Sequence, residues 1–308
     1  MSPVFSIVLC TYNAEAYLDE CIRSLLHQTF KDFELIIVDD GSTDGTLQRL
    51  EDIQDPRIRL VKLGSNHGLI YARTKGFSEA RGRYIAIMDA DDIAHPERLQ
   101  SQWEVFQKQN VDVCGSWHTS LYSATGKKRS RRSPVTNSDI KALLTIYCPI
   151  SNPSASVKME TLQRHQYNTA HQHAEDYGLW CNISANGGTF FNIPRPLLTY
   201  RIHPGQISQQ KRETALKSFQ SIQSRYVASL LGISVTPQAL SFRDRMNQGV
   251  FFMRTLNDKI RGISLRANYQ IYAEFQPRGN GLLTPFIRLE RLLIAAWMTK
   301  LGRYRTDS

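Results

Sequence analysis

Between residues 5 and 88, short apolar runs alternate with segments of helical periodicity. The apolar runs have the length of buried strands and lie at residues 5–10, 33–38, 58–63 and 84–88. The segments between them either place apolar residues at helical spacing, as in 16–27 and 69–80, or begin with capping residues, as in 42–44. Strands and helices in this order predict βαβ units, an α/β fold and a mostly parallel central sheet.

Polar residues follow three of the four apolar runs. They are Thr11, Tyr12 and Asn13 after the first run, Asp39 and Asp40 after the second, and Asp89, Asp91 and Asp92 after the fourth. Any one of these groups is also typical of a turn. Ligands of open parallel sheets bind beyond the carboxyl ends of the strands, so three such groups together indicate a binding site at one edge.

The sequence Asp89-Ala90-Asp91 ends the fourth run with carboxylates that repel each other. Residues two apart in an extended segment point to the same side of the chain, so both carboxylates can hold one divalent cation. Carboxylates used together with substrate phosphates are typical ligands of magnesium or manganese. Such a metal stabilises the charge on a leaving diphosphate. The tripeptide alone is weak evidence because it is common by chance.

The composition excludes several classes of protein. A chain of 308 residues with 41% hydrophobic content can bury a sizeable core. The five cysteines lack CxxC spacing, which argues against a disulfide framework and a structural zinc site and favours a reducing compartment. The N-terminus does not resemble a signal peptide, and no apolar run reaches the roughly 18 residues that cross a bilayer. We therefore expect a cytoplasmic protein.

The net charge of +10 fits nucleic acid, an anionic membrane surface or an acidic substrate. Basic residues gather at 127–132, a run more typical of a solvated loop than of a binding patch. The segment 286–303 has the pattern of a basic amphipathic helix. Such a helix fits a membrane interface, and it fits packing on the rest of the protein or on a second subunit equally well.

The pattern is looser after residue 100. Residues 111–117 and 190–193 are strand candidates, and 121–132 has the composition of a polar loop or a hairpin around Gly126. Helices are expected at 139–147, 173–183 and 209–231. The region from 115 to 170 shows the least recognisable pattern.

Two long segments of the sequence, residues 5–46 (FSIVLCTYN…DDGSTDGT) and 66–92 (NHGLIYARTKGFSEARGRYIAIMDADD), closely resemble glycosyltransferase family 2. The resemblance returns at 173–180 (HAEDYGLW) and 196–208 (PLLTYRIHPGQIS). It implies the GT-A nucleotide-diphospho-sugar transferase fold, with a nucleotide-sugar-binding half at 1–115 and an acceptor-binding and catalytic-base half at 116–208. Outside the resemblance, the helical pattern that begins at 209 leads us to expect a C-terminal helical extension at 209–308.

The resemblance assigns the donor site to matching positions. Thr11 and Tyr12 would hold the base, with Tyr12 stacked on it, and Asp40 would accept a hydrogen bond from its ring N–H. Arg73 would lie near the phosphates or the sugar, although Thr74 stands where the family usually has asparagine. Asp89 and Asp91 would bind the ribose and the metal.

The family's catalytic base corresponds to Asp176 in the pair Glu175-Asp176, with Glu175 as its support or a second acceptor-binding group. An acidic first turn of a helix is also common without any catalytic role. Arg201 and His203 match an R-x-H element, in which the arginine binds phosphate and the histidine binds metal. Trp180 either stacks on a sugar or packs in the core, and Asp92 either contacts sugar or caps a helix.

These features together predict an inverting, metal-dependent glycosyltransferase. It would use a nucleotide-sugar, most simply UDP-linked, with manganese or magnesium, and a hydroxyl of a bacterial surface polysaccharide, lipopolysaccharide or glycolipid as acceptor. Peripheral contact with the cytoplasmic face of the inner membrane is a further expectation. The alternatives are a nucleotidyltransferase that makes NDP-sugars, for which no glycine-rich, lysine-bearing loop is found, and a nucleic-acid-binding module, which the acidic strand ends disfavour.

Overall fold

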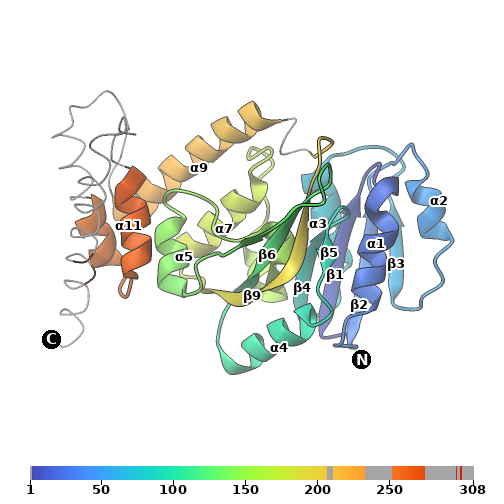
Figure 1. The fold of residues 1–308 in the computed structure, drawn as a ribbon, viewed down its shortest axis with the longest axis horizontal. Coiled ribbons are helices and arrows are strands. Elements are labelled where there is room, and N and C mark those ends of the chain that lie inside the picture. The colour runs from blue at the N-terminus through green and yellow to red at the C-terminus, as the bar shows by residue number, and fades with distance from the viewer. Residues whose placement is uncertain (1, 207–210, 233–251, 275–295, 297–298, 300–308) are drawn as a thin grey trace. The chain divides into compact units, whose positions relative to one another are not determined.

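The structure is a computed structural model that describes residues 2–206, 211–232, 252–274, 296 and 299 (Figure 1). The chain forms two compact units, Met1–Ser133 with Ile150–Phe219 and Pro134–Pro149 with Gln220–Ser308. The division that we expect at residues 115 and 208 stays a prediction. The amphipathic helix predicted at 286–303 lies outside the described residues, apart from positions 296 and 299.

The predicted alternation in the first ninety residues is confirmed. The strands are β1 (Phe5–Thr11), β2 (Phe33–Asp39), β3 (Ile58–Lys62) and β4 (Tyr84–Asp89), and the helices between them are α1 (Glu15–Leu26), α2 (Thr46–Glu51) and α3 (Leu69–Glu79). The four strands are parallel, in the order β3-β2-β1-β4. Their carboxyl ends therefore lie along one edge of the sheet, as Figure 1 lets the reader follow.

The remaining elements of this unit extend the sheet with both parallel and antiparallel strands. They are β5 (Ile93–Ala94), α4 (Arg98–Lys108), β6 (Val113–Tyr122), β7 (Lys128–Arg131), the 3-10 helix η1 (Asn152–Ser154), β8 (Ser156–Lys158), α6 (Met159–Arg164), α7 (Glu175–Ala185) and β9 (Phe190–Ile202). The order along the sheet is β3-β2-β1-β4-β8-β6-β9-β5, and β7 pairs with β6. β8 is antiparallel to its neighbours, whereas β6 and β9 are parallel.

Two strands are longer than the sequence pattern predicts. β6 continues past Trp117 to Tyr122 and turns at Gly126, with φ +66°, into β7, so the hairpin alternative for 121–132 is the right one. β9 extends nine residues beyond the predicted end at Ile193, through Pro194 and Pro196. These prolines are exposed where the register with β6 is irregular, and a bulge is the kind of position where a strand accepts proline.

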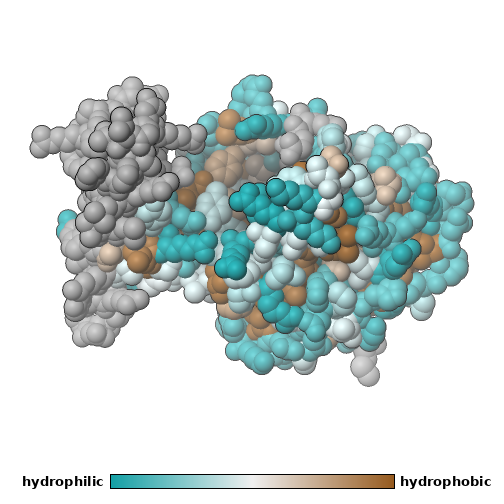
Figure 2. Space-filling model, in the orientation of Figure 1, coloured by the Kyte–Doolittle hydropathy of each residue, from teal (hydrophilic) through white to brown (hydrophobic). Residues whose placement is uncertain are grey.

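Apolar side chains of the sheet and the flanking helices form the core of this unit. Ile7, Leu9, Leu35 and Ile37 of the sheet are almost wholly buried, in one cluster with Leu18, Ile22 and Leu25 of α1. Burial of such side chains is the main source of stability for a domain of this kind. Figure 2 shows hydrophilic residues over much of the face in view, with apolar residues in small groups.

The second unit is helical in its described part. α5 (Asn137–Leu143) begins after Thr136, whose side chain accepts a hydrogen bond from the Asp139 N–H. The C-terminal part of α9 (Arg212–Leu231), a helix at 252–259 and α11 (Leu265–Glu274) complete it. Leu143, Leu231, Met253, Leu256 and Ile271 are among the buried residues of its core. No helix in the described ranges combines the length and apolar character needed to span a bilayer.

Candidate active site

The loops after β1 and β2 are fastened to each other by side chains. The Asn13 side-chain oxygen accepts from the Thr43 N–H at 2.8 Å, and the Ser42 hydroxyl accepts from the Asn13 N–H at 3.0 Å. Tyr12 between them is 48% exposed, so its ring is free to stack on a planar ligand. Thr11 is buried, and its hydroxyl has no hydrogen-bond partner among the described residues.

The carboxylate of Asp40 holds the loop that leads into α3. Its two oxygens accept hydrogen bonds from the N–H groups of His67 at 2.8 Å and Gly68 at 2.9 Å. Gly41 has φ +72°, and a Cβ at this position would lie 2.5 Å from the Ser65 carbonyl carbon. Only glycine therefore permits this close approach of the two loops. The Asp40 oxygens retain acceptor capacity for a ligand N–H, since each has two lone pairs.

The three aspartates at the carboxyl end of β4 have three different surroundings. Asp89 Oδ1 lies 2.6 Å from an Nη atom of Arg73 on α3. Asp91 Oδ2 lies 3.1 Å from His203 Nε2 and 3.2 Å from Gln206 Nε2, so the two residues from beyond β9 meet the aspartate motif. Burial and the neighbouring Asp89 carboxylate raise the pKa of Asp91, while its bonds to His203 and Gln206 lower it. A bound cation would relieve this repulsion.

Asp92 has neither of its two predicted roles. It is wholly buried, which leaves it no exposed surface for contact with a sugar, and α4 begins only after Glu97. Its Oδ1 accepts from the Arg201 N–H at 2.9 Å, and burial, followed by Asp91 and Asp89, raises its pKa well above the ordinary range. Asp92 therefore fixes the end of β9 against the end of β4.

The Arg201 side chain lies between the aspartate motif and α1. Its Nε donates to the Asp91 carbonyl oxygen at 2.8 Å, and an Nη atom lies 2.6 Å from Glu20 of α1. Its guanidinium also covers the Tyr17 ring at 4.7 Å. The role of Arg201 in binding phosphate stays a prediction, and a phosphate would compete with Glu20 for this guanidinium.

The first turn of α7 brings Glu175 and Asp176 to the same region. Glu175 is buried, and its Oε1 lies 2.9 Å from the second Nη atom of Arg73. Burial and the adjacent Glu175 charge raise the pKa of Asp176 from its ordinary value of 3.8 to about 6. Trp180 on the same helix is completely buried, so the core packing alternative is correct and sugar stacking is wrong.

Arg73 is thus the centre of the site. Its side chain is 4% exposed and bridges Asp89 on one side and Glu175 on the other. The Asn152 amide, with its oxygen turned toward the guanidinium, accepts from both Nη atoms at 3.1 Å. The Tyr167 ring lies 5.9 Å from the guanidinium carbon. A buried cation needs such partners, because an uncompensated charge in the interior is costly.

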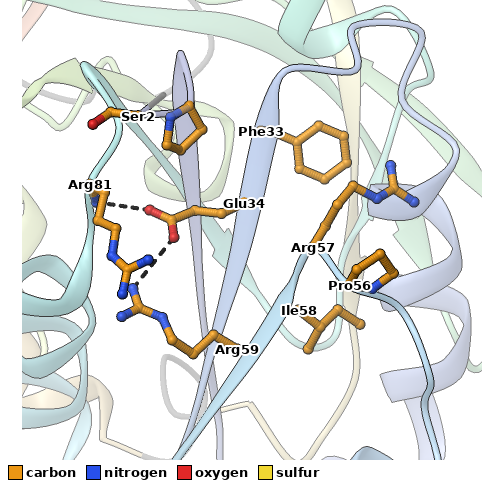
Figure 3. Close-up of a pocket in the computed structure, with 9 residues that line it drawn as sticks. Ser2, Phe33, Glu34, Pro56, Arg57, Ile58, Arg59 and Arg81 are labelled. Atoms are coloured by element: carbon orange, nitrogen blue, oxygen red, sulfur yellow. Dashed lines mark hydrogen bonds and ion pairs between the residues drawn. The ribbon is translucent and has the colours of Figure 1, made fainter.

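A cavity lies away from these residues. It is lined by Ser2, Pro3, Phe33, Glu34, Pro56, Arg57, Ile58, Arg59 and Arg81. Figure 3 shows Arg59 and Arg81 beside Glu34, and Arg57 beside Phe33. Phe33 and Ile58 are the first residues of β2 and β3, so the cavity lies at the amino ends of the strands. The candidate active site lies at their carboxyl ends, where ligands of such sheets bind.

Comparison with known proteins agrees with this geometry. The sequence model described as "Glycosyl transferase family 2" matches residues 6–193, which is more than half of the chain. The chain belongs to glycosyltransferase family 2. This family 2 protein is 32% identical over 250 residues to an "Uncharacterized glycosyltransferase" of Haemophilus influenzae, covering 76% of this chain and 77% of the relative.

A second relative is the "Putative teichuronic acid biosynthesis glycosyltransferase TuaG" of Bacillus subtilis, 30% identical over 225 residues, 70% of this chain and 86% of TuaG. Among solved structures, S. aureus TarS 1-349 in complex with UDP-GlcNAc superposes with a TM-score of 0.58 at 18% identity, covering 100% of this chain and 93% of that one. The mannosyltransferase PcManGT from Pyrobaculum calidifontis, in complex with GDP-Man and Mn2+, superposes with a TM-score of 0.55 at 16% identity, with 99% and 85% coverage. These superpositions confirm the predicted GT-A fold.

The donor atoms of this glycosyltransferase fit a divalent cation. Asp91 offers a carboxylate, and His203 offers an imidazole beside it. Asp89 lies two residues before Asp91, and its Oδ1 contacts Arg73. Within the described ranges, no group of three or more His, Cys, Asp or Glu side chains is arranged to hold a metal by itself. Magnesium is usually bound by only one or two carboxylates of the protein, and substrate phosphates supply further ligands.

Reasoning from sequence missed three members of the site. Gln206 lies in the recognised segment 196–208, but nothing in its spacing marks it as a partner of Asp91. Asn152 stands before a proline and has the pattern of a turn residue. Tyr167 lies in the region whose pattern was least recognisable. All three reach the site only through tertiary contacts.

Proposed function

We propose that this protein transfers a sugar from a UDP-linked donor to a hydroxyl of a bacterial surface polysaccharide, lipopolysaccharide or glycolipid, with inversion at the anomeric carbon and with manganese or magnesium. One observation carries the proposal: Arg73 joins Asp89 of the expected donor site to Glu175 of the expected catalytic pair. A single buried side chain therefore connects the expected site of the leaving diphosphate with the expected catalytic base.

Asp176 is the group that would take the proton of the acceptor hydroxyl. The hydroxyl oxygen would then bond to the anomeric carbon as the bond to the diphosphate oxygen breaks on the opposite face. A carboxyl with a pKa of about 6 is mostly ionised at neutral pH and is a stronger base than an ordinary aspartate. Glu175 is paired with Arg73 beside Asp176, and its charge is one of the causes that raise the pKa of Asp176.

The donor would lie over the loops after β1 and β2. The exposed Tyr12 ring supports stacking of a base, and the buried Thr11 hydroxyl and the Asp40 carboxylate supply polar groups next to it. Aromatic stacking with a few directed hydrogen bonds is an effective way to hold a base. The solved neighbours bound to UDP-GlcNAc and to GDP-Man have this fold, which supports a nucleotide-sugar as donor.

A divalent cation would be held by Asp91 and His203, with Asp89 next to them. Bound there, it would stabilise the negative charge of the departing diphosphate. Arg201 would add a phosphate contact from the same edge. The relative named for teichuronic acid biosynthesis supports a surface polysaccharide as the product class. A cytoplasmic location at the inner face of the membrane fits acceptors of that kind.

The test is release of nucleotide from a panel of UDP- and GDP-sugars, with manganese, with magnesium and with EDTA. We expect turnover of at least one UDP-sugar, loss of it with EDTA, and loss in Asp91→Ala and Asp176→Asn. Asp52→Asn, a change of an exposed carboxylate at the end of α2, is the matched control and should have no effect. The proposal would be overturned if the protein neither bound nor turned over any sugar nucleotide and Asp91→Ala had no measurable effect. Pyrophosphate release from a nucleoside triphosphate and a sugar 1-phosphate would favour a nucleotidyltransferase.

A further inference from the structure

The basic run at 127–132 forms an exposed edge of the sheet. Lys128, Arg129, Ser130 and Arg131 make up β7, which pairs only with β6 in the described sheet. Every residue of the run is exposed. The run is therefore not the solvated loop that its composition favours, but a strand that holds its cations in a fixed array.

The cations of this strand lack acidic partners. None of the five Lys and Arg residues between 127 and 132 makes an ion pair with a carboxylate in the described part of the chain. The ion pairs of this unit are formed by other residues, such as Arg49 with Glu15 and Asp19. Arg132 instead lies 5.4 Å above the Trp117 ring. Protection of an edge against aggregation accounts for lysine on such a strand. It does not account for a cluster of like charges, which repel one another.

β7 lies close to the end of β9, which carries residues of the candidate active site. Lys128 pairs with Leu121 of β6, and Leu121 pairs with Arg201 of β9. Two steps between neighbouring strands place the Lys128 backbone about 10 Å from that of Arg201. The turn between β6 and β7 is fixed there as well, since the Ser123 N–H donates to the Ile202 carbonyl oxygen at 3.0 Å.

We propose that the β6–β7 hairpin binds the surface of an anionic phospholipid bilayer through Lys127, Lys128, Arg129 and Arg131. Exposed cations on both faces of a strand, without a carboxylate partner among the described residues, fit a surface of mobile phosphate headgroups better than one shaped ligand. Each basic residue near such a surface strengthens binding by about fivefold. The hairpin would then hold the end of β9, with Arg201 and His203, close to the membrane.

The inference deepens the proposed function, because it supplies the site at which a lipid-linked acceptor would meet the enzyme. Bilayer binding can nevertheless be measured without any sugar transfer. A failure of the hairpin proposal is thus distinct from a failure of the proposed activity.

The experiment is co-sedimentation of the full chain with vesicles of phosphatidylcholine alone or mixed with phosphatidylglycerol. The test variant changes Lys127, Lys128, Arg129 and Arg131 to Gln and leaves Arg132 on Trp117. The control variant changes four exposed cations, Lys31, Arg81, Arg83 and Lys108, to Gln. These residues lie just before β2, β4 and β6, at the opposite end of the sheet, and the two variants have the same net charge.

We expect the wild type and the control to bind the mixed vesicles, and the hairpin variant to bind them at least ~100-fold more weakly. Binding should be lost at about 0.5 M NaCl, because salt screens exposed charges. Release of nucleotide from a donor in solution should be unchanged in the hairpin variant, which shows that it is folded. Equal binding by the two variants, or equal binding to neutral vesicles, overturns the proposal. Retention of soluble polyphosphate without vesicle binding overturns it too, in favour of a soluble polyanion.

Discussion

The guanidinium of Arg73 lies 2.9 Å from the carboxylate of Glu175, across 102 positions of the sequence. The same guanidinium lies 2.6 Å from Asp89, so one residue of α3 connects the end of β4 with the start of α7. Because the Arg73 side chain is 4% exposed, water cannot replace either carboxylate as its partner. Arg73 therefore holds Asp89 close to Glu175, the residue next to Asp176.

Replacement of Arg73 by Met should both destabilise the protein and abolish sugar transfer. The change leaves the buried Glu175 carboxylate without its cation, which costs about 3–5 kcal/mol when one partner of a buried pair is removed. Urea denaturation measures the loss of stability, and release of nucleotide from the donor measures activity.

The double variant Arg73→Met with Glu175→Gln separates the two effects. Most of the stability should return, because the uncompensated charge is gone, whereas activity should stay low. Arg23→Gln, a change of an exposed arginine on α1, is the control and should change neither measurement. Full activity in the double variant would show that Arg73 does not organise the site.

Asp176→Asn should lower transfer by at least ~100-fold while it stabilises the folded protein, since general bases contribute about 10²–10⁴-fold. Its pKa is raised from 3.8 to about 6 by burial and by Glu175, so the folded state binds the proton more tightly than the unfolded chain. The wild type therefore loses stability as pH rises from about 4 to about 6, by about 1–3 kcal/mol. The Asn variant should lack this decrease.

Unfolding free energies of both proteins between pH 4 and pH 7 provide the measurement. The kcat/KM of the wild type should fall as pH drops through about 6, because Asp176 is then protonated. A wild-type stability curve parallel to that of Asp176→Asn would show that this carboxyl titrates normally.

The first half of the fold was predictable because its signals are local. The apolar runs ending at Cys10 and Val38 specify β1 and β2, and the parallel arrangement then brings Asp40, Asp89 and Tyr12 to one edge. No long-range contact is needed for that inference. The resemblance to the family supplied Glu175 and Asp176, which a helical pattern alone would not distinguish from an ordinary acidic first turn.

The remaining features depend on contacts between distant residues. The partner of Arg73 is 102 positions away, and Asp92 is buried because it fixes the backbone of Arg201, 109 positions away. Trp180 is a core residue because α7 is buried on almost all sides. A helix buried in this way lacks an amphipathic pattern, so the sequence does not show which of its faces lies in the core. β9 was underestimated because Pro194 and Pro196 normally exclude a strand.

Gly41→Ala should destabilise the protein and raise the KM for the donor. A Cβ at Gly41 would lie 2.5 Å from the backbone of Ser65, in a loop that Asp40 ties to His67 and Gly68. Movement of that loop would shift the Asp40 carboxylate away from the place that we propose for the nucleotide base. The left-handed backbone costs about 1–2 kcal/mol, and the overlap adds about 1–3 kcal/mol.

Gly64→Ala is the matched control for this change. Gly64 has φ +75°, but a Cβ there would meet no atom within 4 Å. The control should therefore show the backbone cost alone and keep the wild-type KM. Equal destabilisation by both changes would mean that the contact with Ser65 is not tight.

Tyr167→Phe should stabilise the protein and leave sugar transfer within about twofold of the wild type. The Tyr167 hydroxyl is buried and has no hydrogen-bond partner in the described residues, a situation that costs about 1–3 kcal/mol. The ring is the part that contacts its neighbours, at 5.9 Å from the Arg73 guanidinium carbon and 5.6 Å from the Phe77 ring. Phenylalanine keeps both contacts, whereas Tyr167→Leu removes them and should lower stability and activity together.

Thermal denaturation and donor turnover of the three proteins measure these effects. A large loss of kcat in Tyr167→Phe alone would place the hydroxyl on a substrate instead, and the missing partner would then be the sugar or the acceptor.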